Sequence, residues 1–94
     1  MSLSVRVRPR AVLDLQFAAR WYEGQCPGLG TQFIDEIERL IRSLPENALL
    51  YAARFGTARR AMTRRFPYAV HFLIEPDCVV ILRVLHMRRQ GPEV

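Results

Sequence analysis

The sequence predicts an α+β fold in which one strand, two helices and three further strands follow one another along the chain (β-α-α-β-β-β). Three observations lead to this prediction. Apolar residues recur with the period of an amphipathic helix over two stretches in the first half of the chain. From Arg59 onward the period changes to two, which is the period of a strand. Pro76 and Asp77 then separate two strand-like stretches, as a hairpin turn does.

The chain opens with a strand that is followed at once by a helix. Val5 and Val7 alternate with arginines, as in a half-buried strand, and Pro9 closes this strand and suits the first turn of a helix. We expect the first helix to run from about Arg10 to Gln25. Its apolar stripe is Ala11, Leu15, Ala18 and Tyr22, broadened by Val12, Phe17 and Ala19. We expect the aromatic residues Phe17, Trp21, Tyr22 and Phe33 to pack in the core.

A second amphipathic helix follows a short turn. Residues 27–30 read Pro-Gly-Leu-Gly, which is typical of a tight turn between helices, and Thr31 or Gly28 is the expected N-cap. We expect Pro45 to end this helix, because its ring removes a backbone hydrogen bond and clashes with the preceding turn. The predicted apolar face consists of Phe33, Ile37, Leu40, Ile41 and Leu44.

Three antiparallel strands are expected after the helices. The first begins at Arg59, the second spans 68–74 and the third spans 79–86. Two helices of this length can cover only one face of such a sheet. We therefore expect a two-helix hairpin packed on one face of a small, mainly antiparallel sheet, with the other face open to solvent or to a partner.

Length and charge limit what the protein can be. The 94 residues are expected to form one domain, 1–94, because a chain of this size has no room for a second core. The chain contains 14 arginines and no lysine, and its formal net charge is +5. Arginines cluster in 54–65 and at 88–89, and their flat, permanently charged guanidinium groups suit carboxylates and phosphates. The clusters indicate an anionic partner, which is nucleic acid, a ribosome-like surface or an acidic protein.

No cofactor, metal site or membrane segment is expected. Residues 27–30 lack the lysine and the preceding strand of a phosphate-binding loop. The two cysteines and two histidines show no CxxC or HxxxH spacing, so no metal is predicted. The longest apolar run, 79–82, is far shorter than the roughly 20 residues that span a bilayer. No secretory leader is evident, so we expect reduced thiols and a cytoplasmic protein.

Motifs in every expected element occur in a characteristic order and spacing. They are Pro9 after the first strand; Ala11, Asp14, Leu15 and Tyr22; the Pro27–Gly30 turn with Phe33; the segment Arg64–Tyr68; and the segment Val84–Arg89 with Pro92. With these motifs, the chain resembles the ParE/RelE superfamily of toxins from bacterial type II toxin-antitoxin systems. The likeness covers nearly the whole chain, and it is strongest to the members called ParE or plasmid-stabilisation proteins.

The resemblance implies one of two activities. RelE-like members enter the ribosomal A site and cut mRNA, whereas ParE-like members poison DNA gyrase without chemistry of their own. An antitoxin that wraps the toxin holds both kinds inactive. RelE-like toxins carry an arginine just inside the third strand and an aromatic or His-Tyr pair near the C-terminus, but here the strand position is Ala69 and no tyrosine follows Arg89.

We therefore expect a ParE-like inhibitor of DNA gyrase with no catalytic residues, neutralised by a cognate antitoxin. One alternative is a ribosome-dependent mRNA endonuclease with a rearranged site, and another is a degenerate member that retains only antitoxin binding. In the endonuclease, His86, Arg65 and Arg83 would be catalytic, since a histidine titrates near neutrality and an arginine can hold a phosphate.

Contact with a partner is expected from arginines of both clusters and from two aromatic residues beside them. These residues are Arg59, Arg60, Arg64, Arg65, Tyr68, His86, Arg88 and Arg89. The arginines in 59–65 have an alternative role, which is to protect a strand edge from aggregation. His86 has one too, because it can cap the end of the sheet by hydrogen bonding. Strict alternation places His71 on the same side of its strand as Ala69.

Overall fold

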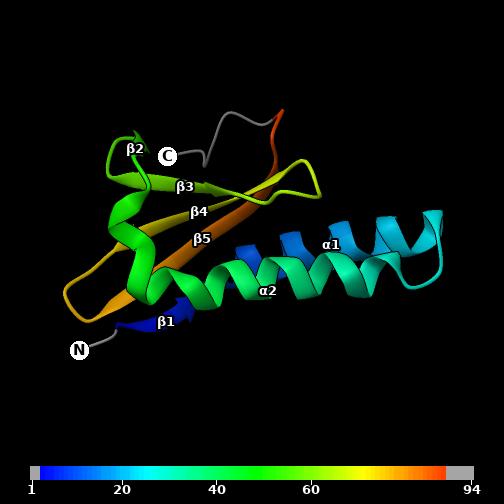
Figure 1. The fold of residues 1–94 in the computed structure, drawn as a ribbon, viewed down its shortest axis with the longest axis horizontal. Helices are drawn as coiled ribbons and strands as arrows, with labels where there is room; N and C mark the ends of the chain where they lie inside the picture. The colour runs from blue at the N-terminus through cyan, green and yellow to red at the C-terminus, as the bar shows by residue number, and fades with distance from the viewer. Residues whose placement is uncertain (1–2, 89–94) are drawn as a thin grey trace.

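The computed structural model describes residues 3–88, apart from the side chains of residues 54 and 55, and consists of a helical hairpin packed against a sheet (Figure 1). In chain order the elements are β1 (Ser4–Val7), α1 (Pro9–Gln25), α2 (Leu29–Asn47), the 3-10 turn η1 (Ala48–Leu50), β2 (Ala53–Phe55), β3 (Ala58–Met62), β4 (Tyr68–Ile74) and β5 (Cys78–His86). The predicted order is confirmed, with one additional strand, β2. The sequence does not reveal β2 because three residues are too few to show a period of two.

The strands form one mixed sheet in the order β1-β5-β4-β3-β2. β1 pairs in parallel with β5, whereas the pairs β5–β4, β4–β3 and β3–β2 are antiparallel. The β1–β5 register ends where Val7 meets Ile81. Beyond Ile81, the outer side of β5 lies next to α1 instead of a strand, and this arrangement creates the site described below.

The two helices lie side by side on one face of the sheet, and the turn that joins them reaches beyond the sheet (Figure 1). α2 contributes large side chains to the core, and Phe33, Ile37 and Leu44 are completely buried. α1 contributes mainly alanines, so the helix backbones approach closely. At Gly30 a Cβ atom would lie 2.5 Å from the carbonyl oxygen of Ala19, so only glycine fits there.

The start of α2 is fixed by groups from the turn and from α1. Gly28 is the N-cap, and its φ of 88° lies in the left-handed region that favours glycine. The Glu23 carboxylate accepts hydrogen bonds from the backbone N–H groups of Gly28 and Gly30, at 2.8 and 3.0 Å. It thereby satisfies donors that the first turn of a helix leaves unpaired. Of the two predicted N-caps, Gly28 is confirmed and Thr31 is not the cap.

Two expectations about the helices are wrong. Pro45 does not end α2, which continues to Asn47. The fixed φ of proline is compatible with a helix, and the next turn is still closed because the Ala48 N–H donates to the Leu44 carbonyl. Phe17 and Trp21 are not core residues, since they are 78% and 57% exposed.

The face of the sheet opposite the helices is not bare at its centre. Val70 and Phe72 belong to the core beneath the helices, so Ala69 and His71 between them lie on the opposite face. Both are nevertheless buried, with exposures of 1% and 0%, and so is Leu85, which pairs with Ala69. The expectation of a face open to solvent is therefore wrong for its centre.

Candidate partner-binding site

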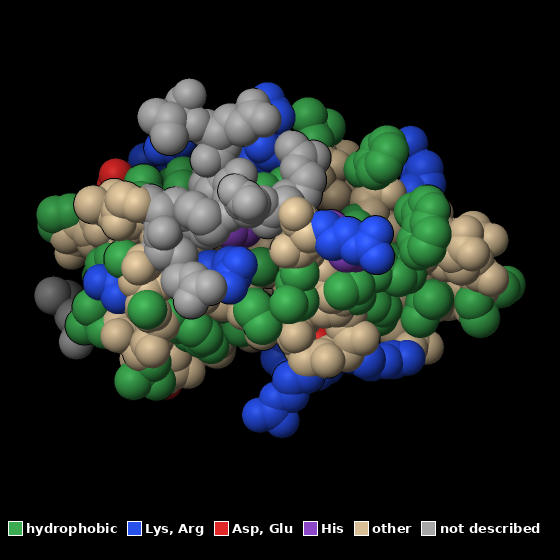
Figure 2. Space-filling view, turned by 90° about the horizontal axis from the view of Figure 1, so that it is seen from above, with side chains coloured by type: hydrophobic (Ala, Val, Ile, Leu, Met, Phe, Trp, Pro, Cys, Tyr) green, Lys and Arg blue, Asp and Glu red, His purple; other side chains and the backbone are tan. Residues whose placement is uncertain are grey.

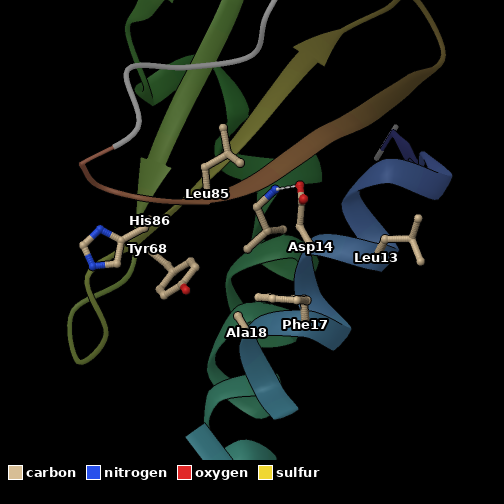
Figure 3. Close-up of a pocket in the computed structure, with 8 residues that line it drawn as sticks. Leu13, Asp14, Phe17, Ala18, Tyr68, Leu85 and His86 are labelled. Atoms are coloured by element: carbon tan, nitrogen blue, oxygen red, sulfur yellow. Dashed lines mark hydrogen bonds between the residues drawn. The ribbon is translucent and has the colours of Figure 1, made fainter. Parts of the chain in front are cut away.

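A shallow hollow of about 340 Å³ lies between α1 and the last part of β5. Phe17 from α1 and Tyr68 from β4 point toward one another there, and the His86 ring lies beside Tyr68 (Figure 3). The α1–β5 hollow is lined by Leu13, Asp14, Phe17, Ala18, Tyr68, Val84, Leu85 and His86. It combines two predicted partner-binding residues, Tyr68 and His86, with helix residues that the sequence did not indicate.

Asp14 fixes α1 against the outer side of β5. Its carboxylate accepts hydrogen bonds from Nε and Nη2 of Arg83, at 2.7 and 3.0 Å. The same carboxylate accepts the backbone N–H of Val84 at 3.0 Å, a donor that lies past the end of the β1 pairing. Asp14 therefore accepts a backbone hydrogen bond from β5 where no strand pairs with it. The same contact holds α1, and with it Phe17, beside the outer side of β5.

A row of exposed apolar side chains runs along α1 beside the hollow. Leu13, Phe17 and Trp21 are spaced four residues apart, so they share one side of the helix, and they are 59%, 78% and 57% exposed. We call these three residues the α1 stripe. A contiguous apolar patch of this kind on a small protein marks an interaction surface. The sequence signal is present, because α1 carries a second apolar row beside the buried alanines.

Tyr68 and His86 are held in place at the mouth of the hollow. Their ring centroids are 5.3 Å apart in an edge-to-face arrangement. Nδ1 of His86 accepts the backbone N–H of Arg88 at 3.1 Å, which fits the capping role left open by the sequence. Burial, assisted by the negative charge of Asp14, raises the pKa of Tyr68, so its hydroxyl is a hydrogen-bond donor at neutral pH.

The loop 63–67 presents Arg64 and Arg65 at the same end of the sheet. The Glu36 carboxylate accepts the backbone N–H of Arg65 at 3.0 Å, and the N–H of Met87 donates to the Pro67 carbonyl at 2.8 Å. These bonds tie the loop to α2 and to the end of β5, where Arg88 is exposed. Several arginine side chains and hardly any acidic ones are visible in Figure 2. Arg89, also predicted to bind a partner, lies outside the described residues.

The two remaining arginines of the predicted set have different surroundings. Nη1 of Arg59 donates a hydrogen bond to the backbone carbonyl of Tyr51, so this side chain braces the segment before β2. Arg60 pairs across the sheet with His71, which in turn pairs with Arg83. Burial lowers the pKa of His71 to about 4, and the positive charges of Arg60 and Arg83 act in the same direction. His71 is therefore neutral at physiological pH.

The residues expected to be catalytic in an RNA-cleaving toxin come from β5 and from the loop after β3. His86 lies at the α1–β5 hollow, Arg65 lies on the loop after β3, and the Arg83 guanidinium is held by Asp14. The described residues also contain no group of three or more histidine, cysteine or acidic side chains placed to bind a metal ion. Within 3–88, no helix has the length and apolar character needed to cross a membrane.

The fold and these surfaces define a small α+β protein that displays arginines and apolar side chains to partners. The ParE toxin family of the type II toxin-antitoxin system parDE matches residues 5–91, so the chain belongs to this family. The protein is therefore the toxin component of such a system, as the sequence predicted, and the system implies a cognate antitoxin as partner.

The fold has a close counterpart among solved structures. A chain of the structure titled "Chromosomal ParDE TA system from P. aeruginosa" superposes with a TM-score of 0.81 at 20% sequence identity. The match covers 90% of this chain and 96% of that chain. At this identity the likeness shows the fold. No curated protein matches the sequence.

Proposed function

We propose that this toxin inhibits DNA gyrase in the cytoplasm, that residues 1–94 act as one domain, and that the cognate antitoxin relieves the inhibition. The observation that carries the proposal is the placement of the two histidines, the side chains suited to proton transfer near neutral pH. His71 is completely buried and neutral, and His86 lies at the α1–β5 hollow with Nδ1 engaged by Arg88. Cleavage of RNA by its own 2′-hydroxyl requires a base, an acid and positive charge around one phosphate.

The partner surface in this proposal is built around the α1–β5 hollow. Phe17, Tyr68 and His86 supply an aromatic contact area, since aromatic residues in pockets dominate the binding energy of many interfaces. The predicted residues Arg65, Arg88 and Arg89 supply positive charge that steers and orients an acidic partner. The other predicted arginines, Arg59, Arg60 and Arg64, belong to a different part of the surface, where Arg60 and Arg64 line hollows beside Tyr51 and Arg59 donates to the Tyr51 carbonyl.

Two assays on the purified toxin, freed of antitoxin, test the proposal. Supercoiling of relaxed plasmid by gyrase should be inhibited, whereas a reporter mRNA in a translation extract should stay intact. Phe17→Ser should weaken the inhibition at least about tenfold, because it removes an aromatic anchor. Leu49→Ser is the matched control, since Leu49 is also 78% exposed but lies in η1. Normal supercoiling at a large excess of wild-type toxin would refute the proposal.

The alternative function is a ribosome-dependent mRNA endonuclease, and one observation favours it. Arg60, His71 and Arg83 follow one another across three neighbouring strands, and both arginines lie close enough to His71 to lower its pKa, so two positive charges flank a histidine in the sheet. If the extract shows cleavage at fixed codon positions, the variants His86→Gln, Arg65→Gln and His71→Gln would identify which residues carry it. Cleavage by the wild-type toxin would reverse the ranking of the two functions.

A further inference from the structure

A second depression lies on another part of the molecule, between α2 and the end of β3. It has a volume of about 440 Å³. The α2–β3 groove is lined by Glu36, Arg39, Leu40, Ser43, Tyr51, Met62, Thr63 and Arg64. It shares Tyr51 and Met62 with an adjoining hollow of about 330 Å³ that also includes Ala52 and Arg60. None of the lining residues belongs to the α1–β5 hollow.

The groove combines apolar side chains with a positive rim. Leu40, Tyr51 and Met62 contribute apolar surface, and Met62 is 45% exposed. Arg39 and Arg64 contribute guanidinium groups, and Arg60 adds a third in the adjoining hollow. A ligand for this groove therefore needs apolar side chains and carboxylates close together.

Negative charge in the groove comes from Glu36, and part of it is already engaged. Oε2 of Glu36 accepts the backbone N–H of Arg65 at 3.0 Å. Arg39 and Arg64 outnumber this carboxylate among the lining residues, and the chain as a whole carries a net charge of +5. The surroundings of the groove consequently attract an acidic segment and repel a basic one.

The walls of the groove are held in place without a ligand. The Tyr51 carbonyl accepts a hydrogen bond from Arg59, and the Tyr51 ring stands edge-on to the buried Phe72 ring, with 6.0 Å between centroids. On the opposite side, the hydroxyl of Thr63 donates to the carbonyl of Phe66. Because little has to be ordered on binding, more of the contact energy is available as affinity.

We infer that the α2–β3 groove binds a segment of the cognate antitoxin in which carboxylate side chains alternate with apolar ones. This inference rests on the assignment of the protein to a toxin-antitoxin pair. A second copy of the chain is a poor occupant, because two surfaces with a surplus of arginine repel each other. A nucleic acid is also a poor occupant, because Tyr51 is the one ring among the lining residues, whereas single strands stack successive bases on several aromatic side chains. The antitoxin can thus be bound at a place separate from the surface proposed for gyrase.

The test compares antitoxin binding by variants whose charge is changed inside the groove with binding by a variant whose charge is changed elsewhere. The double variant Arg39→Glu/Arg64→Glu should weaken binding of the full-length cognate antitoxin at least about tenfold, and Met62→Glu should have a similar effect, because each places a carboxylate against an acidic segment. The matched control is Arg20→Glu/Arg42→Glu, which makes the same change in net charge at exposed helix positions outside the groove. It should change the affinity by no more than about threefold.

Three readouts separate the outcomes. Dissociation constants for the antitoxin are measured at low and high salt, thermal unfolding shows that the variants fold, and gyrase inhibition is measured with toxin alone. Groove variants that fold, inhibit gyrase like the wild type and bind the antitoxin weakly support the inference. Wild-type affinity in the groove variants, or an equal loss in the control, overturns it.

The other occupants give recognisable results. Loss of gyrase inhibition with unchanged antitoxin binding would assign the groove to gyrase and overturn the inference. The inference is also overturned if the groove variants keep antitoxin binding but lose the ability to bind a fluorescent 12-nucleotide DNA strand or to self-associate in sedimentation. If wild-type toxin does not inhibit gyrase but the groove variants still lose antitoxin binding, the proposed function fails and this inference stands.

Discussion

Replacing Asp14 by alanine removes the group that holds α1 on the outer side of β5. The carboxylate accepts three hydrogen bonds, two from Arg83 and one from the backbone of Val84. The side chains of Arg83 and Asp14 are only 12% and 14% exposed, so solvent screens the ion pair weakly. Asp14→Ala therefore removes a carboxylate acceptor from a guanidinium and from a backbone donor in a largely dry place.

The size of the effect follows from this geometry. Removing one partner of a buried ion pair costs about 3 to 5 kcal/mol, because the other charge is left uncompensated. Both side chains keep a little contact with water, so we expect the lower end, about 3 kcal/mol. For a chain of 94 residues this corresponds to a decrease in Tm of about 12 to 24 °C.

Urea unfolding followed by circular dichroism measures this free energy. Asp35→Ala removes an exposed carboxylate from α2 and should change the free energy of unfolding by less than about 0.5 kcal/mol. A double-mutant cycle with Arg83→Met should give a coupling energy above about 1 kcal/mol. A loss of less than about 1 kcal/mol in Asp14→Ala would refute the role assigned to this residue.

Three further outcomes follow from the structure. The pKa of His71 is lowered to about 4 from 6.5, so the unfolded chain binds a proton at a higher pH than the folded chain does. The free energy of unfolding should therefore fall by about 3 kcal/mol as the pH drops from 6.5 to 4. In urea unfolding, His71→Gln should lack this dependence, whereas the control His86→Gln should keep it. Gly30→Ala should destabilise the fold by about 1 to 3 kcal/mol, because its Cβ would lie 2.5 Å from a carbonyl oxygen of α1. Gly24→Ala meets nothing within 4 Å and should stabilise α1 by up to about 1 kcal/mol. Thermal unfolding should therefore show a lower Tm for Gly30→Ala and an equal or higher Tm for Gly24→Ala. Phe17→Ser should leave Tm within about 2 °C of the wild type, since the side chain is 78% exposed, and a larger decrease in calorimetry would make Phe17 a structural residue.

The periodic parts of the fold could be predicted from the sequence. α2 has a regular apolar pattern because it buries one side against the core, and β4 and β5 are two largely apolar stretches separated by the turn at Pro76 and Asp77. The ends and the irregular parts could not be predicted in the same way. Pro45 has a strong average tendency to stop a helix, but α2 continues past it to Asn47 and the Ala48 N–H still donates to the Leu44 carbonyl.

The candidate site was harder to predict because side-chain direction depends on packing. Phe17 and Trp21 were expected in the core, but the alanines of α1 allow the close approach to α2 and leave the aromatic rings outside. In β5, both Ile81 and Val84 belong to the core although they are three residues apart, which strict alternation forbids. The register shift opposite His71 and Phe72 explains this, since a bulge adds a residue to one strand.

The arginine clusters illustrate the same limit. Composition correctly indicates a basic protein, and loop arginines such as Arg64 and Arg65 are exposed. Neighbouring positions in the sequence nevertheless have different surroundings, because Arg59 braces Tyr51 while Arg60 faces His71 across the sheet. Strand geometry sends successive side chains to opposite faces, so a cluster in the sequence is not a patch on the surface.

Supercoiling of relaxed plasmid by gyrase, titrated first with toxin and then with antitoxin, tests most directly whether this toxin blocks gyrase. Supercoiling should decrease as toxin is added and recover as antitoxin reaches a one-to-one ratio with it. Normal supercoiling throughout, together with cut reporter mRNA in a translation extract, would contradict the claim that this toxin blocks gyrase without cleaving RNA.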